Sequence, residues 1–192
     1  MLSRLIFGPP DPSHDCVKIV LQSSRSAFRV FRNEDFRAEL NFYTLSQQEQ
    51  DRIFNELEVT AFVQIYFQTE TLIKFHEDSF KHYLKMIKEN LKLAHQNILK
   101  SSGVEDEHLL TWNKLIDMRL DEYRKDFNEH RSELPNVEEH NPWILVTAVG
   151  GYDHITRGRG KPEDPAYRRI VKWLFKLSDD TNKIFLKAIK RI

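Results

Sequence analysis

The amino-acid sequence predicts a mainly α protein, a helical bundle of four to five helices with a small N-terminal β-hairpin. Residues 46–102 contain no glycine and no proline, so no helix-breaking residue interrupts that stretch. Apolar residues there and in residues 103–130 recur every three or four positions, which is the period of an amphipathic helix. The first 45 residues instead hold three prolines and two short runs rich in β-branched and aromatic residues.

The N-terminal segment is expected to be a β-prone appendage. Its two β-prone runs, residues 16–21 and 27–31, flank a serine-rich stretch where the chain can turn. Proline lacks an amide hydrogen and is disfavoured inside helices, so the prolines before residue 13 indicate an irregular start. We therefore divide the chain into an appendage over residues 1–45 and a helical bundle domain over residues 46–192.

The helical domain is predicted to begin at Ser46. A serine followed three residues later by a glutamate, here Glu49, can satisfy two free amide groups at a helix N-terminus. One unbroken helix from there to residue 102 would be roughly 80 Å long at about 1.5 Å per residue, which is too long for a compact domain of this size. We place a break in the polar residues 69–78, so that two helices pair antiparallel and the second ends near Gly103.

The third predicted helix has the clearest amphipathic pattern in the chain. Its apolar residues advance by three or four positions: Leu109, Trp112, Ile116, Leu120, Tyr123 and Phe127. Farther on, residues 143–149 form an apolar run whose periodicity does not distinguish a buried strand from a short buried helix. Asp164 and Pro165 together are typical of a helix start, and a separate final segment is expected from Ser178.

Any electrostatic function has to be local, because 29 Lys and Arg residues balance 29 Asp and Glu residues over the 192 residues of the chain. Residues 103–140 hold eleven acidic and five basic residues, a net charge of −6. Residues 141–192 hold eleven basic and five acidic residues, a net charge of +6. Two explanations stay open: an acidic helix packs beside a basic one, or the basic end faces a phosphate-rich partner.

The composition indicates a reducing compartment, and we expect a cytoplasmic protein. The single cysteine, Cys16, cannot form a disulfide within the chain, and one thiol is too few for a structural zinc site. No stretch approaches the eighteen or so apolar residues of a membrane span, so no membrane partner is expected.

Several common enzyme classes lack their defining motifs here. The sequence contains no G-x-x-x-x-G-K-[ST] phosphate loop, no G-x-G-x-x-G, no H-E-x-x-H zinc motif and no G-x-S-x-G nucleophile elbow. His76 and His82 are six residues apart, so on one helix they would point to different faces and would not share an ion. We expect neither a metal site nor a cofactor.

The residues that most suggest chemistry are Arg124 and His130, near the end of the third predicted helix. Their side chains can converge if the last helical turn loosens. A guanidinium holds a phosphate through two parallel hydrogen bonds, and an imidazole exchanges a proton near neutral pH. These groups suffice for metal-free cleavage of RNA, in which the 2′-hydroxyl attacks the adjacent phosphate. In the alternative interpretation they are ordinary surface residues beside Glu129.

Residues 121–131, with the sequence DEYRKDFNEHR, resemble the R-x(4–6)-H motif of HEPN (higher eukaryotes and prokaryotes nucleotide-binding) domains. These are α-helical bundles, and many are metal-independent ribonucleases of toxin–antitoxin and antiviral systems that act as dimers. The resemblance implies that Arg124 binds and polarises phosphate, that His130 is the general acid and base, and that Arg131 is near the substrate. It also implies a homodimer, with RNA as substrate and an antitoxin or other protein as partner. Lys125 departs from the family, which usually has a small polar residue after the arginine.

A second candidate for RNA contact is the glycine-rich segment 150–161. Its glycines let backbone amides and cationic side chains close around an anion, and its aromatic rings are suited to stack on a base. In the alternative interpretation the glycines only turn a solvated connection. The residues predicted to contact RNA here are Tyr152, His154, Arg157, Arg159 and Lys161.

Two functions from different classes are compatible with these patterns. The first is RNA binding, or metal-independent ribonuclease activity of HEPN type, centred on Arg124 and His130. The alternative is a non-catalytic helical protein-interaction module that self-associates. The alternative is supported by three aromatic residues that span more than one face of their predicted helix: Phe62, Tyr66 and Phe67. A stripe this wide indicates a dimer face or a groove for a partner.

Overall fold

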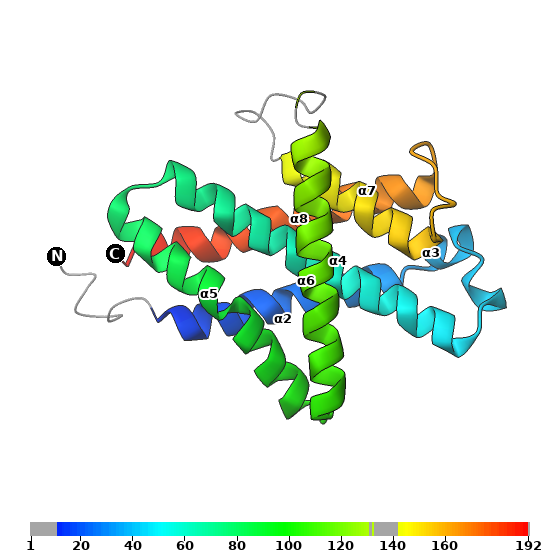
Figure 1. The fold of residues 1–192 in the computed structure, drawn as a ribbon, viewed down its shortest axis with the longest axis horizontal. Coiled ribbons are helices and arrows are strands. Elements are labelled where there is room, and N and C mark those ends of the chain that lie inside the picture. The colour runs from blue at the N-terminus through cyan, green and yellow to red at the C-terminus, as the bar shows by residue number, and fades with distance from the viewer. Residues whose placement is uncertain (1–10, 131, 133–141, 192) are drawn as a thin grey trace.

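The computed structural model describes residues 11–130, 132 and 142–191 (Figure 1). This part of the chain confirms the prediction of a mainly α protein and contains no strand. None of its helices is both long and apolar enough to span a lipid bilayer. It has more helices than the four to five predicted: α2 (Pro12–Phe31), α3 (Glu34–Glu39), the 3₁₀-helix η1 (Phe42–Thr44), α4 (Gln47–Phe75), α5 (Asp78–Ser101), α6 (Asp106–His130), α7 (Pro142–Thr156) and α8 (Pro165–Ile189).

The predicted N-terminal β-hairpin is wrong. Both runs assigned to it, residues 16–21 and 27–31, lie inside the single helix α2. Asp11 caps this helix, because its carboxylate accepts a hydrogen bond from the backbone N–H of Ser13 at 3.0 Å. Pro12 occupies the first turn, where its missing N–H has no helical partner to lose. The proline therefore starts a helix here instead of preventing one.

Helix α2 is amphipathic, but its buried face includes polar side chains. Polar residues interrupt the apolar residues of that face. The apolar residues between them form the short runs 16–21 and 27–31, whose composition is typical of strands. The apolar side chains of α2 belong to the same core as those of α4 and α8. The division of the chain at residue 45 stays a prediction. The buried residues of α2 are Asp15, Cys16, Ile19, Val20, Ser23, Ser26 and Ala27.

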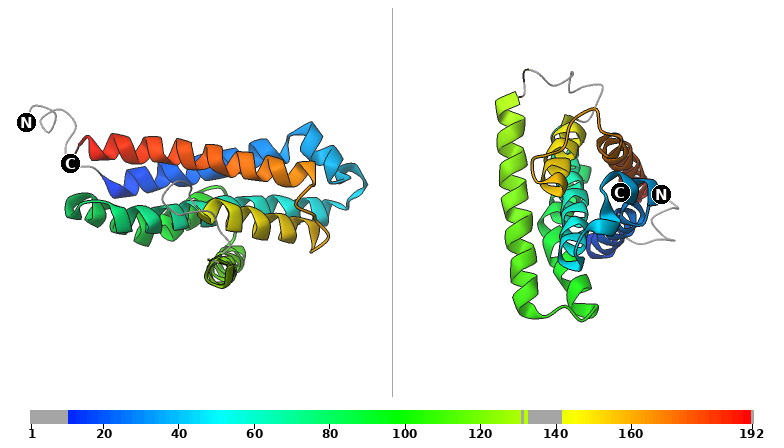
Figure 2. Two further views of the ribbon diagram at one scale, coloured as in Figure 1. Left: turned by 90° about the horizontal axis from the view of Figure 1, so that it is seen from above. Right: turned by 90° about the vertical axis from the view of Figure 1, so that its right-hand side faces the viewer.

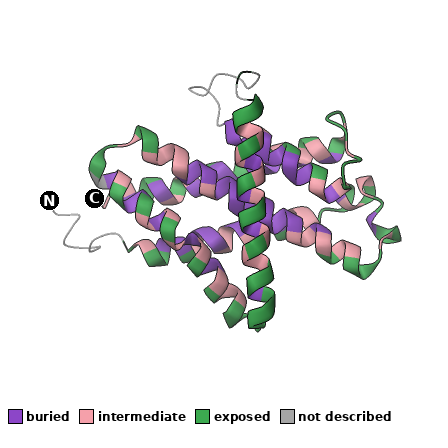
Figure 3. Ribbon diagram, in the orientation of Figure 1, coloured by how far each residue is buried: buried purple, intermediate pink, exposed green. Residues whose placement is uncertain are grey.

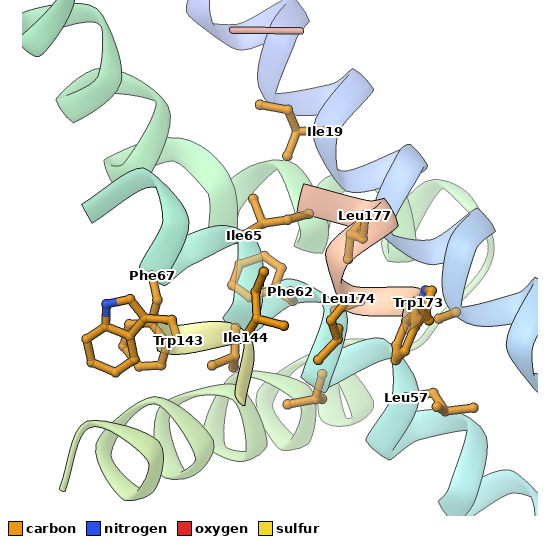
Figure 4. Packing of buried hydrophobic residues seen from close by; sticks show 14 of the residues in the cluster. Ile19, Leu57, Phe62, Ile65, Phe67, Trp143, Ile144, Trp173, Leu174 and Leu177 are labelled. Carbon is orange, nitrogen blue, oxygen red and sulfur yellow. The ribbon is translucent and has the colours of Figure 1, made fainter. Parts of the chain in front are cut away.

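Helix α4 is the centre of the fold. It packs against α2, α5, α6, α7 and α8, and Figure 3 shows the buried residues gathered where the helices cross. Phe62 and Phe67 are both buried in the core (Figure 4). Packing within one chain thus accounts for Phe62 and Phe67, whereas Tyr66 is only half-buried, and self-association stays a prediction.

The predicted pair of long helices is present as α4 and α5. Ser46 caps α4, and its hydroxyl accepts a hydrogen bond from the backbone N–H of Glu49 at 3.3 Å. α4 ends at Phe75 and α5 begins at Asp78, so the break falls within the predicted stretch, and α5 turns back along α4 (Figure 1). Gly103 follows α5 with a φ of 87°, a left-handed conformation that glycine adopts without strain.

Helix α6 lies across the other helices (Figures 1 and 2). It packs against α4, α5 and α7. At its middle, the Arg119 guanidinium donates hydrogen bonds to both carboxylate oxygens of Glu56 on α4, at 2.7 and 3.1 Å. These side chains are only 11% and 8% exposed. A mostly buried ion pair therefore fixes the crossing of α6 over α4.

Lysines of α5 balance part of the acidic charge of α6. Lys92 is paired with Asp117, and Lys100 is paired with Asp106 at 3.0 Å. The acidic helix α6 therefore packs beside a helix that carries lysines, but this helix is not in the basic part of the chain that the prediction considered, residues 141–192.

Residues 143–149 are helical and form part of α7, which runs through both of the glycines that follow. A Cβ atom on Gly150 would overlap the ring of Tyr123 on α6. A Cβ atom on Gly151 would lie 2.5 Å from Oγ1 of Thr60 on α4. These glycines therefore allow α7 to approach its neighbours closely, and they do not end the helix.

Helix α8 begins after Asp164, as predicted, and continues through Ser178 to Ile189. The two predicted C-terminal segments are therefore one helix. Ser178 is buried, and its hydroxyl accepts a hydrogen bond from Nε2 of Gln64 at 3.1 Å, while its carbonyl accepts one from Gln68 at 3.0 Å. A polar residue is tolerated on the buried face of α8 because glutamines of α4 donate hydrogen bonds to its hydroxyl and its carbonyl.

Candidate nucleic-acid interface

The two candidate catalytic residues stand on one regular helix. α6 is helical through His130, so no loosened last turn brings Arg124 and His130 together. Six residues of an α-helix correspond to a rise of about 9 Å and a rotation of about 120°. The two side chains therefore leave α6 in different directions, with Phe127 between them on the helix surface.

Arg124 is bound to a carboxylate of another helix. Its Nη2 atom donates hydrogen bonds to both oxygens of Glu70 on α4, at 3.1 and 3.2 Å. Its guanidinium lies over the ring of Phe67, 5.5 Å from the ring centroid. The arginine side chain is 40% exposed, so a ligand can reach it. These contacts orient the guanidinium before any phosphate arrives.

A second cation reaches the same carboxylate. The ammonium of Lys88 on α5 lies 2.6 Å from Glu70 and 5.1 Å from the ring centroid of Tyr66. Two positive charges therefore share one negative charge, which leaves a net positive charge beside aromatic rings. We call Tyr66, Phe67, Glu70, Lys88 and Arg124 the Glu70 cluster.

Stacked aromatic rings support this cluster. Trp143 of α7 lies between Phe67 of α4 and Phe127 of α6, with its ring centroid 4.0 Å from each and the planes within 20° of parallel. Figure 4 shows the rings of Phe67 and Trp143 face to face. This stack fixes α4, α6 and α7 relative to one another at the place from which Arg124 extends.

His130 is exposed at the end of α6, in an acidic neighbourhood. Burial and the nearby carboxylates of Glu122 and Glu129 raise the pKa of Asp126, one turn before His130. The surroundings of His130 are therefore less favourable to phosphate than the Glu70 cluster is. Arg131, predicted to contact substrate, lies outside the described residues.

The two residues predicted to stack on a base are engaged inside the protein. Tyr152 is buried, and its hydroxyl donates a hydrogen bond to Asp164 at 2.8 Å. Nε2 of His154 lies 2.9 Å from the carboxylate of Glu122, and its ring stacks on that of Tyr123 with an interplanar angle of 22°. Both side chains thus join α7 to neighbouring segments.

The loop after α7 holds three exposed cations, one of which is paired with a carboxylate. Arg157 adopts a left-handed conformation with φ of 56°, and its guanidinium donates hydrogen bonds to Glu49 on α4 at 2.5 and 3.2 Å. Arg159 is exposed, and its Nε donates a hydrogen bond to the carbonyl of Thr156 at 3.1 Å. Lys161 is also exposed. Of the predicted loop cations, Arg159 and Lys161 have no carboxylate partner for their side chains among the described residues.

This loop and the C-terminal end of α6 lie at opposite ends of α7 (Figure 1). The C-terminal part of α6 contacts the first turn of α7 through Phe127 and Trp143, whereas the loop follows the last turn. The 15 residues of α7 span about 22 Å. One phosphate group does not reach both places, so the loop does not deliver a phosphate directly to His130.

Four members of the Glu70 cluster were not assigned to the site from the sequence, namely Tyr66, Phe67, Glu70 and Lys88. Glu70 is 54 residues from Arg124 along the chain, and no local pattern links them. One signal was present, because α5 carries lysines spaced by four, three and four residues, which places them along one side of the helix. We call these residues the lysine ridge: Lys81, Lys85, Lys88 and Lys92.

No protein-family model, curated protein or solved structure matches this chain. Its function is therefore inferred from the placement of its own side chains.

Proposed function

We propose that the protein binds single-stranded RNA along α5 and the C-terminal half of α6, with Arg124 at the centre of the site. The observation that carries the proposal is the convergence of Lys88 and Arg124 on Glu70, beside the half-buried ring of Tyr66. Proteins that bind single strands combine cations that follow the phosphate backbone with aromatic rings on which bases stack. The Glu70 cluster supplies both kinds of group from three helices.

The lysine ridge supports an extended site. From Lys81 to Lys92 it covers about 17 Å of helix, enough to contact more than one nucleotide. Lys85 is exposed and has no carboxylate partner within the described residues. Lys81 is paired only with the exposed Asp78, at 3.7 Å, and such surface pairs contribute little. These two lysines can therefore exchange their surroundings for RNA phosphates at little cost.

Glu70 has two opposite effects in this proposal. It orients Lys88 and Arg124 while the site is empty, and it competes with RNA for the same two cations. Replacing it with glutamine removes the negative charge and keeps nearly the same shape. Changes on the two sides of one ion pair are thus expected to alter RNA affinity in opposite directions.

Arg124→Gln is expected to weaken binding of a labelled single-stranded RNA, and Glu70→Gln is expected to strengthen it. Each cation that neutralises a phosphate adds roughly 0.7 to the slope of log K against log salt for a single strand, so the slope of Arg124→Gln should be smaller by about that amount. The measurement is fluorescence anisotropy over a range of salt concentrations. Lys125→Gln is the matched control, because Lys125 is 73% exposed and leaves α6 about 100° away from Arg124.

Two results would contradict RNA binding at this place. Equal weakening by Arg124→Gln and Lys125→Gln would show that only net charge matters. Weaker binding by Glu70→Gln, with circular dichroism unchanged, would show that Glu70 supports the site and does not compete with RNA.

A second proposal, metal-independent RNA cleavage of HEPN type, concerns His130. Cleavage needs an imidazole and a guanidinium at one phosphate. Within one chain Arg124 and His130 are separated by about 9 Å along α6, so we propose that a homodimer brings Arg124 of one chain to His130 of the other.

RNA cleavage is expected in excess chelator at protein concentrations where light scattering shows a dimer. His130→Ala is expected to abolish this cleavage and to leave RNA binding intact, because the imidazole moves protons and the cations hold phosphate. Equal cleavage by both proteins, or cleavage by neither, would remove the ribonuclease proposal and leave RNA binding to stand alone.

The alternative function, a non-catalytic interaction module that self-associates, was predicted from Phe62, Tyr66 and Phe67 of α4. Phe62 and Phe67 are buried in the core, so of these three residues only the half-buried Tyr66 is left to form such a surface. A partner protein or antitoxin stays a prediction, and a homodimer enters only with the cleavage proposal.

A further inference from the structure

A second site lies on the side of the molecule away from α6. A cavity of about 330 Å³ is bordered there by α2, α8 and residues around the start of α3, and Figure 2 shows α2 and α8 next to each other, opposite α6. No member of the Glu70 cluster lines this cavity. Its volume is near the lower end of the range for small-molecule pockets, roughly 300–1,000 Å³, so it suits one small ligand.

The floor of the cavity is apolar. It is formed by Val30, Phe36, Trp173 and Leu177. The indole N–H of Trp173, the only polar side-chain atom among these four residues, already donates a hydrogen bond to the hydroxyl of Ser26 at 3.1 Å. The floor therefore favours an apolar part of a ligand, whose burial contributes free energy in proportion to the area removed from water.

The rim of the cavity is positively charged. Arg29 on α2 and Lys172 on α8 line it, both are exposed, and neither has a carboxylate partner in the part of the chain that the structure describes. The one acidic residue of the lining, Asp180, is paired with Lys176 at 3.6 Å and with Lys183 at 2.7 Å. Its negative charge is thus neutralised by its own helix.

Of the two other cations of the lining, Lys176 is the partner of Asp180, and Arg169 is held by α3. Its guanidinium donates hydrogen bonds to Glu39 at 3.1 Å and to Asp35 at 3.0 Å. These hydrogen bonds attach α3 to α8 at one end of the cavity. The uncompensated positive charge at the rim therefore belongs to Arg29 and Lys172, one from each of the two long helices.

We propose that this cavity binds a small organic anion with an apolar body, namely a medium-chain carboxylate. The carboxylate lies between Arg29 and Lys172, and the hydrocarbon chain lies on Trp173 and Leu177. A guanidinium binds a carboxylate through two parallel hydrogen bonds, and an ammonium binds it as a point charge. A ligand that has only the carboxylate contacts only the rim, and a ligand that has only the hydrocarbon chain contacts only the floor. The inference is independent of RNA binding, because the two sites share no residue.

The test is a titration of the intact protein with decanoate, monitored by tryptophan fluorescence and by calorimetry. A saturable change in both signals is expected, and the fluorescence change is expected to be lost in Trp173→Phe. Decanol has the chain without the charge, and acetate has the charge without the chain. Each is expected to bind about tenfold more weakly than decanoate or worse.

Variants of the rim and the floor locate the ligand. Arg29→Gln and Lys172→Gln are each expected to weaken decanoate binding about two- to fivefold, as for other exposed charge pairs. Lys187→Gln is the matched control, because Lys187 is exposed on α8 and does not line the cavity. Val30→Trp is expected to fill the cavity and to abolish binding, with circular dichroism confirming that the helices are intact.

Four outcomes would overturn the proposal. Equal affinity for decanol and decanoate would exclude recognition of the anion, and equal affinity for acetate and decanoate would exclude the apolar floor. Unchanged binding by a folded Val30→Trp would place the ligand elsewhere. Failure of decanoate to saturate the wild-type protein would exclude the site altogether.

Discussion

Glu56→Ala is expected to lower the free energy of unfolding by about 3 kcal/mol. Glu56 and Arg119 form a bidentate ion pair whose side chains are 8% and 11% exposed. Removing the carboxylate leaves a largely buried guanidinium whose remaining carboxylate partner is Glu122, at 3.0 Å. Breaking one side of a buried pair costs roughly 3–5 kcal/mol, and the hydrogen bond to Glu122 places the effect at the lower end of that range.

Urea unfolding monitored by circular dichroism measures this effect, since urea does not screen charges. The double variant Glu56→Leu with Arg119→Leu is expected to recover most of the loss, because apolar residues of similar size often replace buried ion pairs without cost. Lys100→Ala is the matched control: its pair with Asp106 has side chains 66% and 78% exposed, and its loss should cost less than about 1 kcal/mol. Equal effects of Glu56→Ala and Lys100→Ala would show that the α4–α6 crossing does not depend on this pair.

At pH 5, His95→Leu is expected to stabilise the protein by about 2 kcal/mol more than it does at pH 7.5. His95 lies between Phe62 and Trp112, with ring centroids 5.4 and 5.6 Å away, and is 4% exposed. Burial lowers its pKa to about 4. A histidine in the unfolded chain has a pKa near 6.5, so below that pH the unfolded state takes up a proton that the folded state does not accept. Stability is therefore unaffected by the titration of His95 above pH 6.5 and falls progressively as the pH decreases towards 4.

Unfolding of wild-type protein and His95→Leu at the two pH values isolates this contribution. Comparing one variant at two pH values cancels the packing change that the substitution itself causes, because packing does not depend on pH. The additional stabilisation of the variant at pH 5 should appear as a relative increase in Tm of roughly 4–8 °C. If the Tm difference between His95→Leu and the wild-type protein is the same at both pH values, the imidazole is accessible to protons in the folded state.

The fold was predictable where local chemistry decides it. The start of α4 follows from a hydrogen bond within one turn, between the Ser46 hydroxyl and the backbone N–H of Glu49. The start of α8 follows from Pro165, whose missing N–H has no helical partner to lose in a first turn. The error in α2 shows the limit of such rules. Asp11 and Pro12 carry the same start signal as residues 164 and 165, but the prolines before them favoured an irregular segment, and serines in the buried face hid the helical period.

The candidate site was predictable only in part, for a different reason. The spacing between Arg124 and His130 singles out Arg124, but the carboxylate that orients it belongs to α4 and the second cation belongs to α5. Likewise, nothing near Tyr152 in the sequence shows that its hydroxyl is bound to Asp164 and its ring is buried. Contacts between helices depend on how the helices cross, which a periodicity along one helix does not specify.

The packing of α8 on α2 affects how the protein is made. Ser26 and Trp173 are hydrogen-bonded across 147 residues of sequence, so the apolar face of α2 leaves the ribosome long before α8 is synthesised. At about 5–20 residues per second, that delay is on the order of ten seconds. During this time α4 and α5 can cover part of α2, but the surface that α8 buries stays open to water and to chaperones. The native core of the nascent chain is therefore completed only after its last long helix has emerged.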